Sequence, residues 1–378
     1  MNIEVVIGSN YGDEGKGLVT EYLCRNRPSP IVILSNGGCQ RGHTVNNKEL
    51  SCRHIFHHFG SGTLLGIPTV LSRTFLLNPI TFVEEWNSLP VKPVVFRAPG
   101  CLLQLPGDMF TNQMLEINRD KDRHGSCGWG IWETISRNER NKLTFESFAK
   151  MSYDQKKETI LEAYEYQRWY RLNKMEINEI VEEQITSNPF IDHFISDFIF
   201  MYQHTIPLKY DNLLDTDWKE YGFNIETFIV ENGQGLGLDE EYTNDKIHTT
   251  PTSCGLKGAR LAIGAGVQNE KLIGNYVSRS YFTRHGAGPF PEETKDLSYI
   301  DYTNIYNPYQ GHMRFGKMDF YHFNIMKDRI LNDAKNYKAS DYRIIITHRS
   351  YNDFISHFAS WNDSNILYSF NDDSRHIR

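Results

Sequence analysis

The sequence has no C-x-x-C pair among its six cysteines, which stand at positions 24, 39, 52, 101, 127 and 254. Without such a pair, a zinc site is not indicated. No run of about 18 apolar residues occurs, so we expect no membrane span. The N-terminal "MNIEVVIGSN" lacks a basic segment followed by an apolar one, so we expect no signal peptide. These absences favour a cytoplasmic protein with reduced thiols.

An excess of positive charge is also missing. The formal net charge is -7 and the isoelectric point is about 6.1. A surface that binds polyanions is therefore not indicated, and we expect no nucleic-acid partner. The 378 residues are 39% hydrophobic and 23% charged, which is enough apolar material for a substantial core.

Short apolar runs, often followed by glycine, recur along the chain. They lie at residues 3–8, 30–38, 92–100, 227–235, 272–282 and 342–349. Such runs, separated by helical patterns, predict an α/β fold with a mainly parallel, P-loop-NTPase-like central sheet flanked by helices. Residues 145–204 show apolar positions at three- and four-residue spacing and predict a helical insertion with a solvated, charged face. No repeat or linker is evident, so we predict one domain over residues 1–378.

The most informative segment is "NYGDEGKG", residues 10–17, which follows the first apolar run. A Walker A loop would need glycine at position 10 and Ser or Thr at position 17, but Asn10 and Gly17 stand there. A tight turn between strand and helix remains an alternative. Backbone amides at a helix start, with Lys16 nearby, nevertheless favour a phosphate site. Within such a site, Asp13 could hold Mg²⁺ or take a proton from a substrate N–H.

This octapeptide resembles the "QWGDEGKG" signature of the adenylosuccinate synthetase family. Further blocks resemble family blocks in the same order, namely "NGGCQRGHTV" (36–45), "HHFGSGTL" (57–64), "LNPITFVEE" (77–85), "GSCGWGI" (125–131), "ENGQGLGLD" (231–239) and "TRHGAGPFPEE" (283–293). The resemblance implies a ligase that joins L-aspartate to C6 of a purine nucleotide. A nucleoside triphosphate first phosphorylates the 6-oxo group, and the aspartate amine then displaces phosphate.

The resemblance also implies roles for individual residues. Asp13 matches the catalytic acid or base and a Mg²⁺ ligand, His43 the catalytic histidine, and Gln234 the glutamine at the purine 6-position. The carbonyl of Gly42 would complete the metal site. The matching nucleotide- and phosphate-binding positions are Asn10, Gly12, Glu14, Gly15, Lys16, Gly17, Gly42, Thr44, Ser126, Cys127 and Thr252. Cys127 would be a weaker donor than the family's threonine.

Two further features of the family concern charged substrate groups. The family borrows an arginine from the second subunit of a dimer, and Arg137 is the nearest match, with a plain surface arginine as the alternative. The aspartate-binding loop corresponds to residues 308–316, where Gln310, His312 and Arg314 are the matching positions. An arginine suits a carboxylate because its planar fork donates two hydrogen bonds. A homodimer is implied by the resemblance alone.

Departures from the family pattern bear on the substrates. Ser350 stands where the family reads guanine with aspartate, so we expect ATP or dATP rather than GTP as donor. His312 replaces an arginine that reaches the acceptor ribose. These changes resemble the bacteriophage, PurZ-like branch, which joins aspartate to dGMP and gives N6-succino-2-amino-2′-deoxyadenylate for 2-aminoadenine synthesis. Retention of Asp13 favours the alternative, an enzyme acting on IMP. A non-catalytic nucleotide-binding module is a third reading, and it would need neither His43 nor Gln234.

Overall fold

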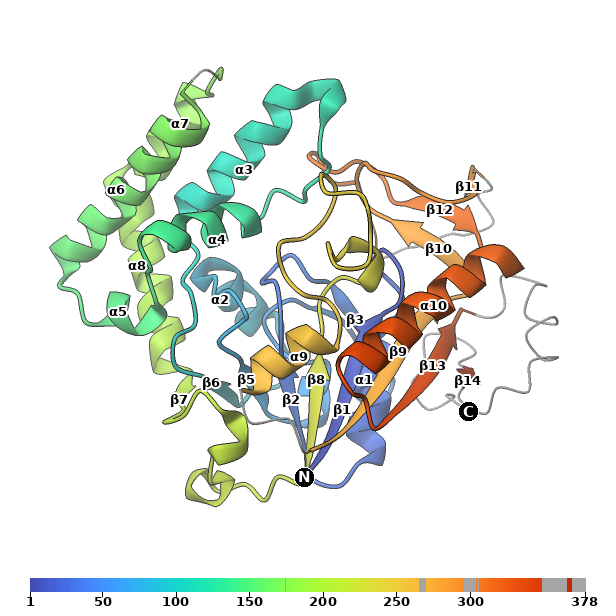
Figure 1. Ribbon diagram of the computed structural model, residues 1–378. Coiled ribbons are helices and arrows are strands. Elements are labelled where there is room, and N and C mark those ends of the chain that lie inside the picture. The colour runs from blue at the N-terminus through green and yellow to red at the C-terminus, as the bar shows by residue number, and fades with distance from the viewer. Residues whose placement is uncertain (174, 265–269, 296–303, 305, 349–365, 369–378) are drawn as a thin grey trace.

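A computed structural model of the chain describes residues 1–173, 175–264, 270–295, 304, 306–348 and 366–368 (Figure 1). Within these residues, nine strands form a single sheet in the order β14-β13-β9-β1-β8-β2-β5-β6-β7, and each neighbouring pair is parallel. The strands are β1 (Asn2–Gly8), β2 (Pro30–Leu34), β5 (Thr69–Leu71), β6 (Val95–Arg97), β7 (Ile206–Pro207), β8 (Thr227–Glu231), β9 (Lys271–Arg279), β13 (Asp341–Thr347) and β14 (Ile366–Tyr368). The predicted α/β class with a mainly parallel sheet is confirmed.

Two small antiparallel sheets accompany the central one. The first has the order β10-β12-β11, and the second is the hairpin β3-β4. Their strands are β10 (Tyr281–Arg284), β11 (Glu293–Thr294), β12 (Arg314–Lys317), β3 (His43–Asn47) and β4 (Cys52–Phe56). The hairpin brings residue 43 next to helix α1, which packs against β3.

Helices pack against the sheet, and a further group of helices lies beside it. They are α1 (Lys16–Asn26), α2 (Pro79–Ser88), α3 (Pro106–Arg119), α4 (Ile131–Arg140), α5 (Phe145–Ala149), α6 (Tyr153–Arg171), α7 (Glu179–Thr186), α8 (Asn188–Gln203), α9 (Leu256–Ile263) and α10 (Phe320–Asn336), with 3-10 turns at Thr63–Leu65, Asp120–Asp122, Leu213–Asp215, Trp218–Tyr221 and Leu236–Leu238. In Figure 1, α9 and α10 lie in front of the strands, and α3 to α8 form a group beside the sheet. Among the described residues, no helix combines the length and the apolar character that crossing a membrane requires.

The central strands are short apolar runs because both of their faces are covered. Every residue of β2 and β8 is buried, as is β1 after its first residue. Parallel strands that are covered on both faces read as continuous hydrophobic runs rather than as alternating ones. This property made β1, β2 and β8 predictable from the sequence.

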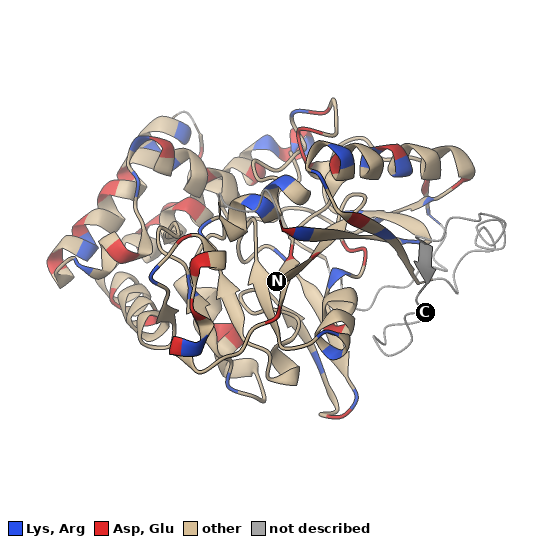
Figure 2. Cartoon of the chain, turned by 60° about the horizontal axis from the view of Figure 1, so that its bottom comes forward, with Lys and Arg blue, Asp and Glu red and all other residues tan. Residues whose placement is uncertain are grey.

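The segment 145–204 is helical, as predicted, and consists of α5 to α8. Helix α8 packs on α2, and α6 packs on α3. Phe145, Phe194 and Phe198 belong to the same hydrophobic cluster as the residues of the central sheet. Figure 2 shows acidic and basic residues interspersed along these helices, as expected for a solvated face.

Candidate active site

The loops that carry Asp13 and Gln234 lie where β1 and β8 end. In an open parallel sheet, ligands bind in the crevice outside the carboxyl ends of the strands. The loop 9–15 follows β1, and Gln234 follows β8 by three residues. Because β1 lies between β8 and β9, these segments meet at one edge of the sheet.

The loop after β1 is organised around its own carboxylate, Glu14. Its Oε1 accepts hydrogen bonds from the backbone amides of Asn10 (3.1 Å) and Gly12 (2.9 Å). Its Oε2 lies 2.6 Å from the Nζ of Lys16, and both side chains are 2% exposed. Lys16 is thus paired within its own loop, and its part in phosphate binding stays a prediction. The second acid of the octapeptide neutralises the lysine and accepts from the amides inside the loop.

The same loop is fixed from the neighbouring strands. The hydroxyl of Thr283 donates to the carbonyl of Gly12 (2.8 Å), and that of Thr347 donates to the carbonyl of Glu14 (2.7 Å). The side-chain amide of Asn10 donates to Ser278 Oγ (2.9 Å), so it points to β9 rather than to a ligand. These bonds hold Asp13 at a φ of 60°, in the left-handed region that residues other than glycine rarely adopt.

The carboxylate of Asp13 pairs with His285, whose Nε2 lies 3.1 Å from Asp13 Oδ2. Burial raises the pKa of Asp13, but the charge and hydrogen bond of His285, aided by Arg279 and Lys16, hold that pKa well below its ordinary value. The carboxylate is therefore ionised at neutral pH and can accept a proton or a cation. In the block that resembles "TRVGxGPFPTE", His285 stands in place of the valine.

His43 sits in a buried charge network at the start of β3. Its Nδ1 lies 2.6 Å from Glu231 Oε1, and Arg41 lies 2.9 Å from the same oxygen. Burial and Arg41 lower the pKa of His43 to about 4, although Glu231 opposes them. Burial raises the pKa of Glu231, but Arg41 and His43 outweigh it and leave a carboxylate. Because Glu231 engages Nδ1, Nε2 is the ring nitrogen that can act on a substrate.

Gln234 is oriented by its neighbours. Its Oε1 accepts hydrogen bonds from Thr252 Oγ1 (3.2 Å) and from the amide of Asn36 (3.4 Å). Since the oxygen is used in this way, the side-chain nitrogen is the atom that can donate to a ligand. Thr252 therefore supports Gln234 in this structure, whereas the sequence assigned it to a phosphate.

A pocket of about 440 Å³ opens beside this edge of the sheet, within the usual range for small-molecule sites. Four predicted site residues line it, namely Gln234, Ser126, Cys127 and Gln310. Asp13 and His43 are not among the lining residues, but Asp13 contacts His285, which lines the pocket. The hydroxyl of Ser126 donates to Asn112 Oδ1 (3.0 Å), and burial raises the pKa of Cys127 to about 11, so its thiol stays protonated.

Arg137 is not placed as the sequence suggested. Its guanidinium is 5% exposed and donates to Asp108 and to the carbonyl of Leu103 (2.9 Å). The ion pair with Asp108 spans 2.8 Å and fastens α4 to the start of α3. A plain surface arginine does not describe this buried side chain, and its role toward a second subunit stays a prediction.

The three candidates for binding aspartate differ in where they lie. Arg314 donates to Glu293 and to the carbonyls of Gly286 and Gly288, so it ties the loop after β10 to β11 and β12 instead of offering its fork to a substrate. His312 is exposed and packs on Tyr306 outside the pocket. Of the three candidates, Gln310 alone lines the pocket. Ser350 lies outside the described residues.

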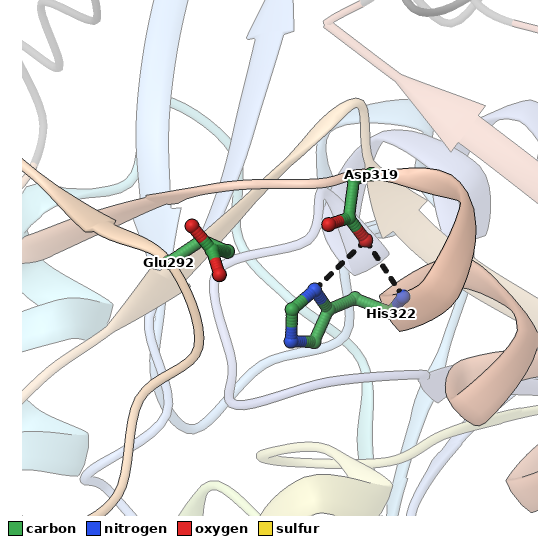
Figure 3. A group of neighbouring side chains, drawn as sticks. All are labelled: Glu292, Asp319 and His322. Atoms are coloured by element: carbon green, nitrogen blue, oxygen red, sulfur yellow. Dashed lines mark hydrogen bonds and ion pairs between the residues drawn. The ribbon is translucent and has the colours of Figure 1, made fainter.

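The family resemblance assigns Mg²⁺ to Asp13 and the carbonyl of Gly42, and this assignment stays a prediction. Both are hard oxygen donors, which suit Mg²⁺, and the low pKa of Asp13 keeps its carboxylate ionised. A second group, Glu292, Asp319 and His322, lies at the start of α10 (Figure 3). Asp319 and Glu292 are exposed, and Asp319 already caps α10 through the amide of His322 (2.8 Å). None of these three lines the pocket, so we assign them no role.

The sequence model of the adenylosuccinate synthetase family matches residues 5–307, which is well over half of the chain. The chain belongs to the adenylosuccinate synthetase family. It is 27% identical over 302 residues to the adenylosuccinate synthetase of Buchnera aphidicola and 31% identical over 311 residues to that of Neisseria gonorrhoeae. These alignments cover 76% and 77% of this chain and 65% of each relative, so the chain spans about two thirds of their length.

Solved structures of the family show the same fold. The fully ligated adenylosuccinate synthetase of Plasmodium falciparum superposes with a TM-score of 0.68 at 16% identity, covering 91% of this chain and 76% of that one. The succinoaminodeoxyadenylate synthetase (PurZ) of cyanophage S-2L superposes with a TM-score of 0.64 at 12% identity, covering 100% and 95%.

The sequence reasoning missed Glu231 and His285. Glu231 opens the quoted block "ENGQGLGLD", and an acid three residues before the expected catalytic glutamine was the available signal. His285 departs from the valine of its block, which was visible but not weighed. Both contact a predicted catalytic residue.

Proposed function

We propose that the protein is a ligase that joins L-aspartate to C6 of dGMP, with ATP or dATP as phosphate donor. The product would be N6-succino-2-amino-2′-deoxyadenylate, a precursor of 2-aminoadenine nucleotides. The observation that carries the ligase assignment is the contact of Asp13 with His285, which lines a pocket together with the oriented amide of Gln234. A carboxylate and an amide donor at one edge match the N1–H and the 6-oxo group of a purine.

The first half-reaction follows from these two side chains. Asp13 accepts the N1 proton, electron density moves to O6, and O6 attacks the γ-phosphorus of the donor. The amide nitrogen of Gln234 donates to O6 and stabilises the negative charge that develops there. Asp13 is ionised beside His285, as a group that accepts a proton must be.

In the second half-reaction, the aspartate amine attacks C6 and inorganic phosphate leaves. His43 would act on the departing oxygen through Nε2, because Glu231 holds Nδ1 and fixes the ring. The aspartate amine loses a proton as its bond to C6 forms. A proton gained at Nε2 of the neutral His43, which the negative phosphoryl group favours, is then given to the departing phosphate. Mg²⁺, held by Asp13 and Gly42, would neutralise charge on the phosphates.

The choice of dGMP rests on departures from the family pattern. Ser350 offers no carboxylate to a guanine donor base, and His312 replaces an arginine that would reach the ribose. The similar cyanophage structure is described as bound to dGMP, with dATP as energy donor. The second candidate, an adenylosuccinate synthetase acting on IMP, is favoured by the retention of Asp13. We also propose that the protein is a homodimer, as the family resemblance implies.

Turnover decides between these functions. Protein, Mg²⁺, aspartate and ATP or dATP are incubated with dGMP, GMP or IMP, and released phosphate and the succino-product are measured. We expect release with dGMP, and none with dGMP for the variant Asp13→Ala. Release with IMP alone would replace dGMP by the second candidate. Release with none of the three would leave a binding module as the function.

The donor is tested separately. Replacing Ser350→Asp should improve the use of GTP relative to ATP, because aspartate can accept hydrogen bonds from guanine N1–H and N2–H. An unchanged donor preference would show that position 350 does not face the donor base.

A further inference from the structure

A buried carboxylate on α10, that of Asp333, binds both ends of one segment of the chain. Its Oδ1 accepts hydrogen bonds from the hydroxyl of Tyr242 (2.7 Å) and from the backbone amide of Leu256 (3.2 Å). A Cβ at Gly255 would lie 2.3 Å from the same oxygen, so a glycine is needed there for this close approach. The segment 242–256 is therefore closed into a loop whose two ends meet at a single atom.

The third partner of Asp333 belongs to the core. Its Oδ2 accepts from the hydroxyl of Tyr276 on β9 (2.7 Å), and both side chains are fully buried. Burial raises the pKa of Asp333 to about 6, although the three donors oppose this rise, so the group is a carboxylate at neutral pH. An ionised acceptor forms stronger hydrogen bonds than a neutral one, which suits a group that holds several elements together.

The segment that Asp333 closes forms one wall of the pocket. Residues 246–251 all line the pocket, whereas Asp333 is not among the lining residues. The next residue, Thr252, donates to Gln234 Oε1 (3.2 Å), and this bond leaves the side-chain nitrogen of Gln234 for a ligand. Asp333 thus connects the buried side of α10 with the wall of the pocket and with the orientation of Gln234.

The end of α10 contacts the beginning of this wall at a second point. Tyr337 directly follows the helix, and its backbone amide donates to the carbonyl of Asp333 (3.0 Å). Its hydroxyl donates to the carboxylate of Glu241, the residue before Tyr242 (2.5 and 2.7 Å). Two neighbouring residues of the loop are therefore held by the last turn of one helix.

We propose that Asp333 is a positioning residue that holds the pocket wall 246–251 and the contact between Thr252 and Gln234 in the geometry that binds the purine monophosphate. This inference rests on the proposed function and adds to it a residue that acts on the site from α10. Loss of the Tyr242 bond would free one end of the segment. Loss of the Tyr276 bond would leave both ends in place.

Two matched substitutions separate positioning from packing in the core. Tyr242→Phe and Tyr276→Phe each remove one hydroxyl from the same carboxylate, but Tyr242 alone belongs to the segment. We expect Tyr242→Phe to raise KM for dGMP about 10-fold, as for the loss of one hydrogen bond to a charged group, with KM for ATP unchanged. Tyr276→Phe should lower the melting temperature at least as much and leave both KM values unchanged. Asp333→Ala would remove all three bonds and destabilise the core, so the tyrosines give the sharper comparison.

Hydrogen exchange observes the segment without relying on activity. Exchange of peptides that cover residues 240–251 is followed by mass spectrometry in Tyr242→Phe, alone and combined with Tyr337→Phe. We expect these peptides to exchange faster than in the unaltered protein, because a released end lowers the free energy of local opening. In Tyr276→Phe they should exchange as in the unaltered protein.

The remaining outcomes separate this inference from the proposed function. Unchanged exchange and unchanged KM for dGMP in both loop variants would overturn the inference. Faster exchange without a change in KM, or an equal rise of KM in Tyr276→Phe, would also overturn it, because the position of the loop would then not govern binding. Failure of the unaltered protein to bind or use any purine monophosphate would instead defeat the proposed function, and the exchange of residues 240–251 would then decide whether Asp333 holds the pocket wall.

Discussion

At the scale of single residues, Glu231 organises the environment of His43. One carboxylate accepts a bond from His43, pairs with Arg41 and also accepts from the backbone amide of Ser61 (3.0 Å). The Glu231 side chain is fully buried. Its charge is stable there because these three partners surround it.

Replacing Glu231→Gln should therefore reduce kcat by about 10- to 100-fold, by analogy with the loss of an orienting partner of a metal-bound histidine. Arg41 would lose its buried counter-charge, so we also expect a lower free energy of unfolding, by about 3–5 kcal/mol. Kinetics below the melting temperature and urea unfolding measure the two effects. Glu49→Gln is the control, because Glu49 is 61% exposed and pairs with Arg25. A folded variant with normal kcat would contradict the orienting role.

His58 gives the clearest pH dependence. It is fully buried, accepts from the backbone amide of Asn78 (3.1 Å), and burial lowers its pKa to about 3. An unfolded histidine titrates near 6.5, so the unfolded state takes up a proton that the folded state refuses as the pH falls from about 6.5 toward 3. Stability that is present above pH 6.5 is thus lost on acidification. We expect the urea midpoint of His58→Gln to fall less between pH 7.5 and pH 5 than that of the unaltered protein. An equal fall would show that His58 is not buried in its neutral form.

At the scale of elements, α1 packs against β3 at Gly17. A Cβ at this position would lie 2.9 Å from the carbonyl oxygen of Thr44 and 3.1 Å from His43. Because the first contact is with backbone, the helix and the strand would have to separate. The glycine thus brings the loop of Asp13 and the strand of His43 together.

Gly17→Ala should lower the free energy of unfolding by about 1–3 kcal/mol, as overpacking does, and should reduce kcat by displacing His43. Asn26→Ala, at the exposed end of the same helix, serves as the control and should change neither quantity. Thermal unfolding and steady-state kinetics give the comparison. Normal activity in Gly17→Ala would mean that the packing of α1 on β3 does not position His43.

Elements differ in how far the sequence reveals them. Strands β1 and β8 are continuous apolar runs that end at glycine-containing loops, and their order along the chain located the loops of Asp13 and Gln234. Strand β5 has three residues and β7 has two, too few for a recognisable pattern. The places of Arg137 and Arg314 depend on acids 29 and 21 residues away in the sequence, and only the folded chain selects such partners.

At the scale of the whole molecule, one hydrophobic cluster connects the sheet with the helices of 145–204. Phe198 of α8 is 2% exposed and belongs to the same cluster as Phe228 of β8. A shared core favours unfolding as one cooperative unit. The organisation as one domain over residues 1–378 stays a prediction that unfolding can test.

We expect far-UV circular dichroism and tryptophan fluorescence to report a single coincident thermal transition. Phe198→Ala should lower the transition midpoint of both signals equally. The free energy of unfolding should fall by about 3–5 kcal/mol, the usual cost of truncating a buried aromatic ring. Two separate transitions, with the substitution shifting one of them, would show that the helical segment folds independently.

The internal carboxylate of Glu14 has a consequence for discrimination among solutes. Because the loop contains its own carboxylate, its amides and Lys16 already have a partner. The binding of sulfate or orthophosphate would therefore release little free energy. A ligand with several charged oxygens and an accompanying cation would gain more free energy by binding there. Self-occupancy of this kind would keep the turn selective in a cell crowded with simple inorganic ions.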